Sequence, residues 1–368
     1  MRNSKERHQE IAEAFDRTID PLAKYNEQFQ TVGSDPFQLW LDDVIYSKDY
    51  VDDTIVAIER RVAQWCNFVW AEYNRHPAVP STSHVITFAE YYLNERNNKK
   101  GTVSAKLSTL DQAYEYFQME PAFPHPKDFN PFKSAKNRMD LSGEDPKDQY
   151  PIPLDELREF IDVEVKHIRD RALIVIQLKL GLRASEVSNI KLSEINITNS
   201  ELQNHYDELG AHPMLQGRPN AVYIPHDRDR NKSKRPRVLP LDEELRRVLL
   251  QYLLCRPDNG RPWLFLSKSG GKKMDHTNIN DVWKKYFRPK YGPTEQYRGV
   301  SSHYGRHRFT TWFRIDKGWQ RDLLKYLRGD IQSGGELEPT KEAIDSYIHT
   351  RYEKIEDKFR RDIYQLRV

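Results

Sequence analysis

The sequence predicts a mainly α-helical protein of two domains, with a small β-hairpin in the second. Apolar residues recur at helical spacing along most of the 368 residues. Two segments, 221–225 and 237–241, have the composition of short strands and flank a charged turn. A polar stretch at 139–153, rich in turn-forming residues, divides the chain into two parts that are each long enough for a core of their own.

The first part of the chain is expected to be helical throughout. Residues 1–34 are highly charged with apolar residues at helical spacing, which predicts a charged helical extension. Residues 35–138 are predicted to form a small all-helical domain, with helices from near Asp53 to Tyr73, over 88–93 and over 103–117. Because proline interrupts helices, Asn130-Pro131-Phe132 is expected to close this domain.

The second domain is expected to follow the linker and to run from residue 154 to 368. A helix capped by Pro153 should open it. An apolar helix over 172–180 should end at Gly181, since glycine readily adopts the left-handed conformation that ends helices. The hairpin comes next, and the chain from residue 242 onward is predicted to be mainly helical.

Global charge does not identify a ligand. The chain has 58 basic and 55 acidic residues, a net charge of +3, so a DNA-binding surface would have to come from uneven placement of charge. Ser269-Gly-Gly-Lys-Lys lacks the first glycine and the final Ser or Thr of a phosphate-binding loop, which argues against a nucleoside triphosphate site. An acidic triad of the two-metal type is not evident in the sequence either.

The cysteines and the hydropathy pattern predict a soluble, cytoplasmic protein without membrane contact. Cys66 and Cys255 lie far apart among apolar residues, so we expect two buried thiols of an intracellular protein rather than a disulfide or a metal site. The first residues lack the apolar stretch of a signal peptide. An uncharged run long enough to span a bilayer is also missing from the sequence.

Arg183 is the first candidate for a functional side chain. It follows Gly181 and precedes Ala-Ser-Glu186, where a new helix is predicted to begin. The start of a helix favours anions, and an arginine there would add to such a site. The alternative is a surface arginine paired with Glu186 on the same helical face.

The hairpin tip is the second candidate. It carries six basic residues against Asp227 and Asp229: Arg228, Arg230, Lys232, Lys234, Arg235 and Arg237. A basic β-ribbon fits a phosphate backbone or a groove of DNA. A solvated charged turn is the alternative, but the flanking strands should hold the lysines in fixed places.

His303-Tyr-Gly-Arg306-His307 is the densest cluster of chemically useful side chains. On a helix, residues three and four apart share a face, so the two histidines and the arginine can present together. A metal site of His303 and His307 is disfavoured, because the zinc-protease glutamate and an obvious third ligand are missing from the sequence. His307 could instead pack inward and bond a backbone carbonyl.

Tyr347, in Tyr-Ile-His, is a candidate nucleophile. With 20 tyrosines in the chain, any one of them is more often a packing residue, and Tyr352 competes directly for the role. A tyrosine can attack a phosphate only if the phosphate is held in place and a proton acceptor lies nearby.

In their order along the chain, these motifs resemble the tyrosine recombinase (phage integrase) family. Each segment is weak alone, and the ordered set is specific. The segments are Gly181-Leu-Arg183-Ala-Ser-Glu186-Val, Asn231-Lys232-Ser-Lys234-Arg235-Pro-Arg237-Val-Leu-Pro-Leu, His303-Tyr-Gly-Arg306-His307 and Tyr347-Ile-His349. The first domain is similar to the SAM-like core-binding domain that precedes such catalytic domains. The resemblance implies a C-shaped clamp around DNA.

The resemblance also implies a role for each residue. Arg183 and Arg306 would hold the scissile phosphate, and Tyr347 would attack it to give a 3′-phosphotyrosyl link and a free 5′-hydroxyl. The remaining roles would fall to Lys232 as proton donor (or Lys234, since hairpin register is uncertain), His303 as acid or base, and Glu186 as an orienting group; His307 is left without a fixed role. Metal, ATP and other cofactors are not required in such a mechanism.

One position departs from the family pattern. Tyr326-Leu-Arg-Gly329-Asp330 has aspartate where the family usually has His or Trp. An aspartate cannot donate a hydrogen bond unless protonated, so that role is either lost or moved to another group. The sequence of this segment is similar to that of archaeal members of the family. This suggests an integrase of a plasmid, virus or provirus, that is, of a mobile genetic element.

The resemblance implies double-stranded DNA recombination sites as partners and self-association to a tetramer on DNA. Integration, excision and dimer resolution all remain open, as does a need for accessory DNA-bending proteins. Two alternatives remain as well. One is a catalytically impaired DNA-binding protein of the same fold, motivated by Asp330, and the other is a relaxing enzyme like the type IB topoisomerases, which share the chemistry.

Overall fold

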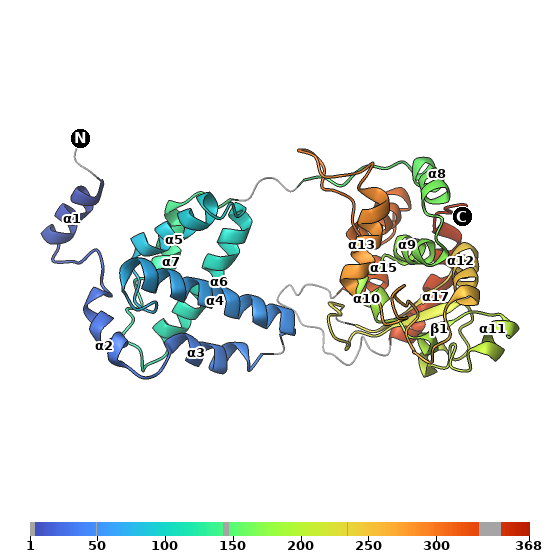
Figure 1. The fold of residues 1–368 in the computed structure, drawn as a ribbon, viewed down its shortest axis with the longest axis horizontal. Coiled ribbons are helices and arrows are strands. Elements are labelled where there is room, and N and C mark those ends of the chain that lie inside the picture. The colour runs from blue at the N-terminus through green and yellow to red at the C-terminus, as the bar shows by residue number, and fades with distance from the viewer. Residues whose placement is uncertain (1–3, 49, 143–146, 234, 331–346) are drawn as a thin grey trace. The chain divides into compact units, whose positions relative to one another are not determined.

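The computed structural model describes residues 4–48, 50–142, 147–233, 235–330 and 347–368, with only the backbone described for 4–6 and 347–351. The chain forms two compact units, Met1–Pro146 and Lys147–Val368 (Figure 1). The division lies within the stretch predicted as a linker. The finer domain limits and the C-shaped clamp stay predictions.

The first unit is helical, as predicted. The long helix α4 and its neighbours α5 and α6 confirm the expected positions, and α5 and α6 are longer than expected. The helices are α1 (Ser4–Ala14), α2 (Asn26–Thr31), α3 (Pro36–Trp40), α4 (Asp52–Tyr73), α5 (Thr82–Asn94), α6 (Lys100–Met119) and α7 (Pro131–Arg138), with a 3-10 turn at Ala23–Tyr25 and a π turn at Leu41–Ile45.

Trp65 of α4 lies at the centre of this unit. Its ring is fully buried and makes edge contacts with Phe88 of α5 at 5.1 Å and with Phe132 of α7 at 5.2 Å. The expectation that Asn130-Pro131-Phe132 closes the domain is wrong. Asn130 caps α7 by accepting hydrogen bonds from the backbone of Phe132 and Lys133, and Pro131 takes the first helical position, where its missing N–H costs nothing.

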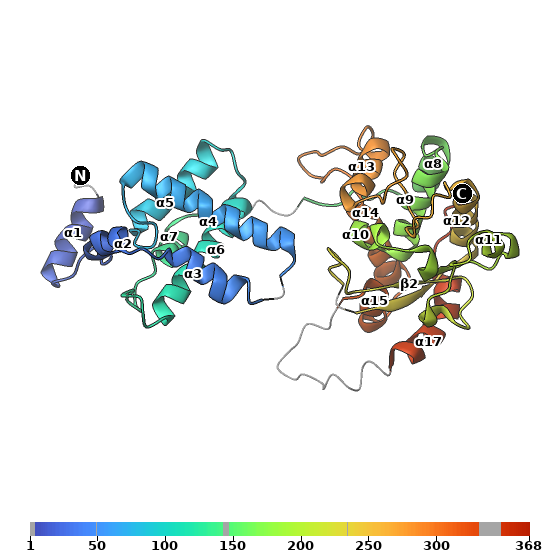
Figure 2. The ribbon, with the colours of Figure 1, turned by 60° about the horizontal axis from the view of Figure 1, so that its bottom comes forward.

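The second unit combines helices with a three-stranded antiparallel sheet in the order β1-β2-β3 (Figure 2). The predicted hairpin is confirmed, and the two-residue strand β1 was too short to be predicted. The strands are β1 (Ile195–Asn196), β2 (Ala221–Ile224) and β3 (Arg237–Pro240). The helices are α8 (Leu154–Glu164), α9 (Ile168–Leu180), α10 (Ala184–Ser188), α11 (Ser200–His205), α12 (Glu243–Cys255), α13 (His276–Phe287), α14 (His303–Thr311), α15 (Arg321–Arg328) and α17 (Tyr347–Asp362); short 3-10 turns lie at Leu192–Glu194 and Pro213–Leu215 and a π turn at Trp312–Asp316.

Helix α9 is the centre of the second unit. Its residues from Ala172 to Leu180 are buried, and it packs against α12 and α14. The end of the chain packs on the same core, since Ile355, Phe359 and Leu366 are buried there. These residues therefore cover the core of their own unit, and α17 ends at Asp362.

Two further expectations are tested by burial and hydropathy. Cys255, at the end of α12, is exposed, so the prediction that it is buried is wrong; Cys66 is half-buried, and burial raises the pKa of its thiol to about 12. Among the described helices, none has the length and apolar character to cross a bilayer.

Candidate active site

Arg183 is placed by the sharp turn that ends α9. Gly181 adopts the left-handed conformation at φ +63°, and a Cβ there would lie 2.5 Å from a ring carbon of Phe309 in α14. Only glycine allows this close approach. The Gly181 carbonyl accepts a hydrogen bond from the Arg306 guanidinium at 2.9 Å. The turn therefore brings Arg183 and Arg306, which are far apart in sequence, to the same place.

Arg306 is held rigidly although it is charged. Its side chain comes from α14 and the residue is 2% exposed. One guanidinium nitrogen donates to the Gly181 carbonyl, and the other donates to the Arg328 carbonyl at 3.0 Å. Burial and the neighbouring Arg183 lower the pKa of Arg306 to about 9, so it remains a cation at neutral pH.

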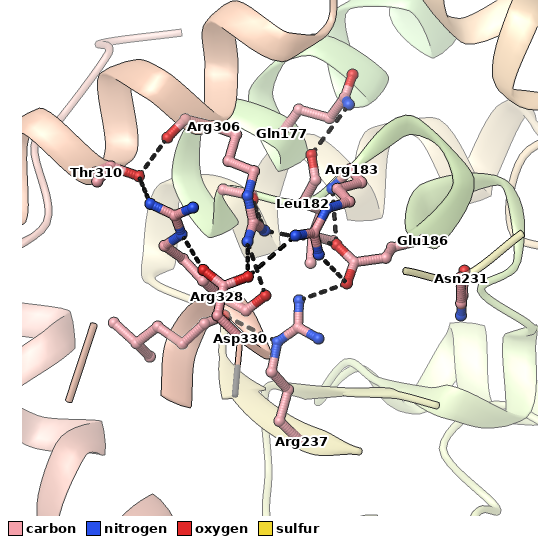
Figure 3. Close-up of polar contacts among 12 residues, drawn as sticks. Gln177, Leu182, Arg183, Glu186, Asn231, Arg237, Arg306, Thr310, Arg328 and Asp330 are labelled. Atoms are coloured by element: carbon pink, nitrogen blue, oxygen red, sulfur yellow. Dashed lines mark hydrogen bonds and ion pairs between the residues drawn. The ribbon is translucent and has the colours of Figure 1, made fainter. Parts of the chain in front are cut away.

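Glu186 holds the arginines in position through both of its carboxylate oxygens. It is 1% exposed and accepts hydrogen bonds from the Arg183 backbone N–H at 2.7 Å and from Arg237 Nη2 at 3.0 Å, with Arg306 Nη1 at 3.9 Å (Figure 3). Burial alone would raise the pKa of Glu186, but Arg237 and Arg306 bring it below its usual value. This carboxylate thus bonds the N-cap of α10, and its Oε1 lies 3.8 Å from Arg183 Nη1, which is the pairing given above as the alternative for Arg183.

Arg237 belongs to the buried cluster of the candidate site, whereas the sequence interpretation placed it at the basic hairpin tip. It was counted with the basic hairpin tip, but the first residue of β3 is 1% exposed and turned inward, where its Nε donates to the Leu327 carbonyl at 2.8 Å. Arg228 is half-buried and pairs with the buried Glu194 at 2.7 Å, so it is not a free cation of the tip either. The available signal was the apolar sequence that follows Arg237, which is typical of a buried strand.

Asp330 fills the space between the two candidate phosphate ligands. Its Oδ1 accepts from Arg183 Nη2 at 3.0 Å and from Arg306 Nη2 at 2.8 Å, and its Oδ2 lies 2.7 Å from Arg328 Nε (Figure 3). We call Arg183, Arg306 and Arg328 with this carboxylate the arginine clamp. Burial would raise the pKa of Asp330, but the three arginines lower it, so the carboxylate is ionised.

Asp330 reaches the clamp because α15 ends at a second left-handed glycine. Gly329 has φ +67°, and a Cβ there would lie 2.9 Å from Arg237 Cζ. A larger residue would push the turn away from Arg237. The sequence showed that Asp330 departs from the family pattern, and the structure shows that the aspartate is an acceptor for the arginines.

The two histidines lie in the first turns of α14, beside the clamp. Their ring centroids are 4.7 Å apart, and both residues are exposed. The alternative that His307 packs inward is therefore wrong. Partial desolvation lowers the pKa of His303 to about 4, and His307 and Arg306 add to the shift, so the His303 imidazole is neutral at pH 7. Among the described residues, His, Cys, Asp and Glu form no group suited to a metal ion.

The remaining candidates differ in how much the structure describes. Lys232 is an exposed residue of the loop between β2 and β3, and Lys234 lies outside the described residues. Tyr347 is the first residue of α17, and its side chain lies outside the description. Tyr352 is buried against Leu215, Ala221 and Val238, and burial raises its pKa, which is typical of a packing residue.

The arrangement can bind an anion with two or more oxygens. Three guanidiniums converge on one carboxylate, and the buried Nη1 atoms of Arg183 and Arg237 have no hydrogen-bond partner among the described residues. Donors left over beside an occupied anion position suit a group with more oxygens than a carboxylate, such as a phosphodiester.

The family model that matches this chain is that of the phage integrase family, over residues 151–329. The match covers the clamp arginines and the hairpin and ends before Tyr347.

Curated relatives point to the same group. The chain is 27% identical over 178 residues to tyrosine recombinase XerA of Pyrococcus horikoshii, covering 48% of this chain and 50% of that protein. It is 24% identical over 172 residues to tyrosine recombinase XerC of Roseiflexus sp., covering 46% and 53%. The chain thus spans about half the length of these relatives.

Solved structures share the fold. A Tn1549 transposon integrase in complex with circular intermediate DNA matches with a TM-score of 0.57 at 16% identity, covering 86% of this chain and 98% of that one. A lambda integrase tetramer bound to a Holliday junction matches with a TM-score of 0.57 at 14% identity, covering 92% and 89%. At these identities the likeness concerns the fold.

Proposed function

We propose, from the premise that this chain belongs to the phage integrase family of tyrosine recombinases, that it cuts and rejoins DNA at specific sites through a 3′-phosphotyrosyl intermediate. The observation that carries the proposal is the arginine clamp. Arg183 and Arg306 donate to the same oxygen of Asp330, and two guanidiniums so converged are the groups that hold a phosphate oxygen in the transition state.

In this proposal the scissile phosphate takes the place of the Asp330 carboxylate. The two anions need the same donors, so the phosphate enters as Asp330 leaves. Glu186 keeps the guanidiniums of Arg237 and Arg306 in place throughout, because its contacts lie on the other side of the cluster from Asp330 (Figure 3). The clamp is thus already arranged for charge that develops on phosphorus.

Proton transfer is assigned to His303 and to Lys232. Tyr347 attacks phosphorus and the bond to the 5′-oxygen breaks. His303 is neutral at pH 7, so it serves as the base that accepts the tyrosine proton. Lys232 donates a proton to the departing 5′-oxygen, with Lys234 as the alternative. The phosphotyrosyl bond conserves the energy of the phosphodiester, so rejoining needs no nucleotide, metal or other cofactor.

The proposed partners are double-stranded recombination sites and further copies of this chain. The solved relatives support this choice, since one is an integrase with circular intermediate DNA and another is a tetramer on a Holliday junction. We therefore propose a tetramer on DNA that acts in the cytoplasm, on the DNA of a mobile genetic element. The C-shaped enclosure of DNA by the two domains, which the family resemblance implies, is part of the same proposal.

A second candidate function is DNA binding without cleavage. The observation in its favour is Asp330 itself, which occupies the anion position and contributes negative charge where the family usually has a hydrogen-bond donor. Covalent chemistry separates the two functions. A relaxing enzyme would share the covalent step and differ only in its products.

The test is a covalent capture. Nicked duplexes of randomised sequence are incubated with the protein, and DNA that stays attached through denaturation is sequenced to find the site. We expect an adduct with the unaltered protein, none with Tyr347→Phe, and an adduct with Tyr352→Phe. DNA binding by Tyr347→Phe should be unchanged.

Other results would redirect the proposal. An adduct with Tyr347→Phe would show a different nucleophile, and binding without any adduct would favour the DNA-binding function. Once a site is known, incubating two copies on separate duplexes distinguishes strand exchange from simple relaxation.

A further inference from the structure

Asn189 connects the arginine clamp to the hairpin that carries Lys232. It is the C-cap of α10, the five-residue helix whose N-cap is Arg183, and it is 3% exposed. Its side-chain nitrogen donates to the Asp229 carbonyl at 2.9 Å and to Asn231 Oδ1 at 3.0 Å. Both acceptors belong to the loop between β2 and β3, and Asn231 directly precedes Lys232.

The orientation of the Asn189 amide is fixed from its other side. Lys273 Nζ lies 2.5 Å from Asn189 Oδ1 and 4.0 Å from the ring centroid of Trp263. An ammonium group has donors and no acceptor, so the amide oxygen must face Lys273. The NH2 group must then face the hairpin loop, which is the direction that both of its hydrogen bonds require.

The loop is fastened at several points before it reaches Lys232. Asn231 is buried and donates to the Pro225 carbonyl at 2.9 Å, which closes the loop on itself. Arg228 donates to the Asn189 carbonyl and pairs with the buried Glu194. Arg230, which lies between Arg228 and Asn231 in the sequence, is in the left-handed conformation at φ +62°. The backbone that leads into the exposed Lys232 is therefore anchored to the end of α10.

We propose that Asn189 is a positioning residue for the proton-donating lysine. The short helix α10 positions a phosphate-binding guanidinium, that of Arg183, at its N-terminus. At its C-terminus the Asn189 amide holds the loop that carries the proton donor. One short helix thereby positions both the group that stabilises charge on the phosphate and the group that protonates the leaving oxygen. Asn189 acts through the loop and does not touch the reacting atoms. The inference rests on the proposed function, in which Lys232 protonates the 5′-oxygen.

A change of leaving group tests this inference. In the normal substrate the bond from phosphorus to the 5′-oxygen breaks and that oxygen takes a proton from the lysine. In a 5′-bridging phosphorothiolate the departing atom is sulfur, which leaves as a stable thiolate because thiols are acidic, with pKa values of roughly 8.5. A defect in proton donation therefore slows cleavage of the oxygen substrate and spares the sulfur substrate.

The expected result for Asn189→Ala is selective. Single-turnover adduct formation on the oxygen substrate should slow by roughly 10- to 100-fold, as for a misplaced catalytic group. Cleavage of the sulfur substrate should stay within about twofold to threefold of the unaltered protein. Lys232→Ala should show the same selectivity with a larger loss, about 100-fold or more. The double variant should be no slower than Lys232→Ala alone.

Matched controls keep the test specific. Asn196→Ala removes a similar amide-to-carbonyl bond, from Asn196 Nδ2 to the Arg218 carbonyl at 3.1 Å, at the opposite end of β2 from the tip. It should not change the ratio of the two rates. Arg183→Ala should slow both substrates alike, because the clamp acts on either leaving group.

Three results would overturn the inference. If Asn189→Ala slows the sulfur substrate as much as the oxygen substrate, Asn189 does not act through the proton donor, while the proposed function stands on the adduct of the unaltered protein. Should Asn189→Ala not fold, Asn231→Ala removes one of the two hydrogen bonds of the Asn189 amide from the hairpin side, and an equal loss on both substrates would again overturn the inference. If the unaltered protein cleaves neither substrate, the proposed function fails and this inference with it.

Discussion

The arginine clamp and the hairpin loop lie in the same unit but differ in whether the candidate catalytic side chain itself is buried. The clamp arginines are held by groups far apart in the sequence. Arg306 donates to the carbonyls of Gly181 and Arg328, and its Nη1 lies 3.9 Å from a carboxylate oxygen of Glu186. The hairpin loop is also held by distant residues, Asn189 and Glu194, but Lys232 itself is exposed, whereas Arg306 is buried.

This contrast fits the different tasks proposed for the two parts of the site. Groups that stabilise charge gain from burial and rigid partners, because fixed dipoles need no reorganisation during the reaction. Lys232, the proposed proton donor, would have to approach and leave its acceptor, and in its case the loop before it is anchored while the side chain is exposed. Three substitutions and a pH profile test this division.

The largest effect is expected from Arg306. Arg306→Lys keeps the charge but cannot donate to Gly181, Arg328 and a phosphate together, since a lysine ammonium is a single point of charge. We expect adduct formation to fall by about 100- to 1,000-fold. Single-turnover capture on the nicked duplex measures this fall. A loss of less than about threefold would show that the clamp does not hold the phosphate.

The second change concerns the stability of the buried cluster. Glu186→Gln leaves the buried Arg237 without its ionic partner, and we expect unfolding free energy to fall by about 3 kcal/mol. Denaturant unfolding measures it, with Glu243→Gln as a control because the carboxylate of Glu243 pairs with Arg246 at the surface. Equal effects of the two changes would contradict the central place given to Glu186.

The third change removes the competing carboxylate. Asp330→Asn should bind orthovanadate more tightly, by about tenfold or about 1.4 kcal/mol, because the anion no longer displaces an ionised group. Titration calorimetry measures the affinity. Asp316→Asn, at an exposed position, removes the same charge elsewhere and should have little effect. Weaker binding by Asp330→Asn would mean that the carboxylate supports the clamp instead of competing for it.

The smallest effect is a pH dependence. His303 has a pKa of about 4, so it stays able to accept a proton from pH 8 down to about 5, and adduct formation should lose this contribution only below that. The unfolded chain has an ordinary histidine pKa of about 6.5 and binds the proton first, so the same group also lowers stability as pH falls from about 6.5 to 4. A pH–rate profile with an inflection near 6.5 would contradict the depressed pKa.

The sequence predicted the larger features because they depend on local patterns. The helical spacing of α4, the glycine that ends α9 and the two strands of the hairpin all follow from neighbouring residues. Burial of Arg237 and the pairing of Asp330 with Arg183 do not, because they join segments more than 50 residues apart. Charge alone assigned Arg237 to the surface, and only the fold shows its partner Glu186.

Asn189 illustrates the same limit. Nothing in the sequence around Asn189 predicts its hydrogen bonds to residues 229 and 231. They join segments about 40 residues apart, which only the fold brings together. The catalytic assignments of Lys232 and Tyr347 remain predictions that rest on the order of motifs. Burial of Tyr352 supports Tyr347 in that choice.

The most direct test of the account is the chemical identity of the DNA linkage. Trypsin cuts after Lys341 and Arg351, so the peptide 342–351 contains Tyr347 as its single tyrosine and Tyr352 falls in the next peptide. Mass spectrometry of the digested adduct should find a nucleotide on Tyr347, in an amount that falls sharply in Arg183→Ala and Arg306→Ala. A nucleotide on another residue, or full linkage in the absence of either arginine, would contradict the account.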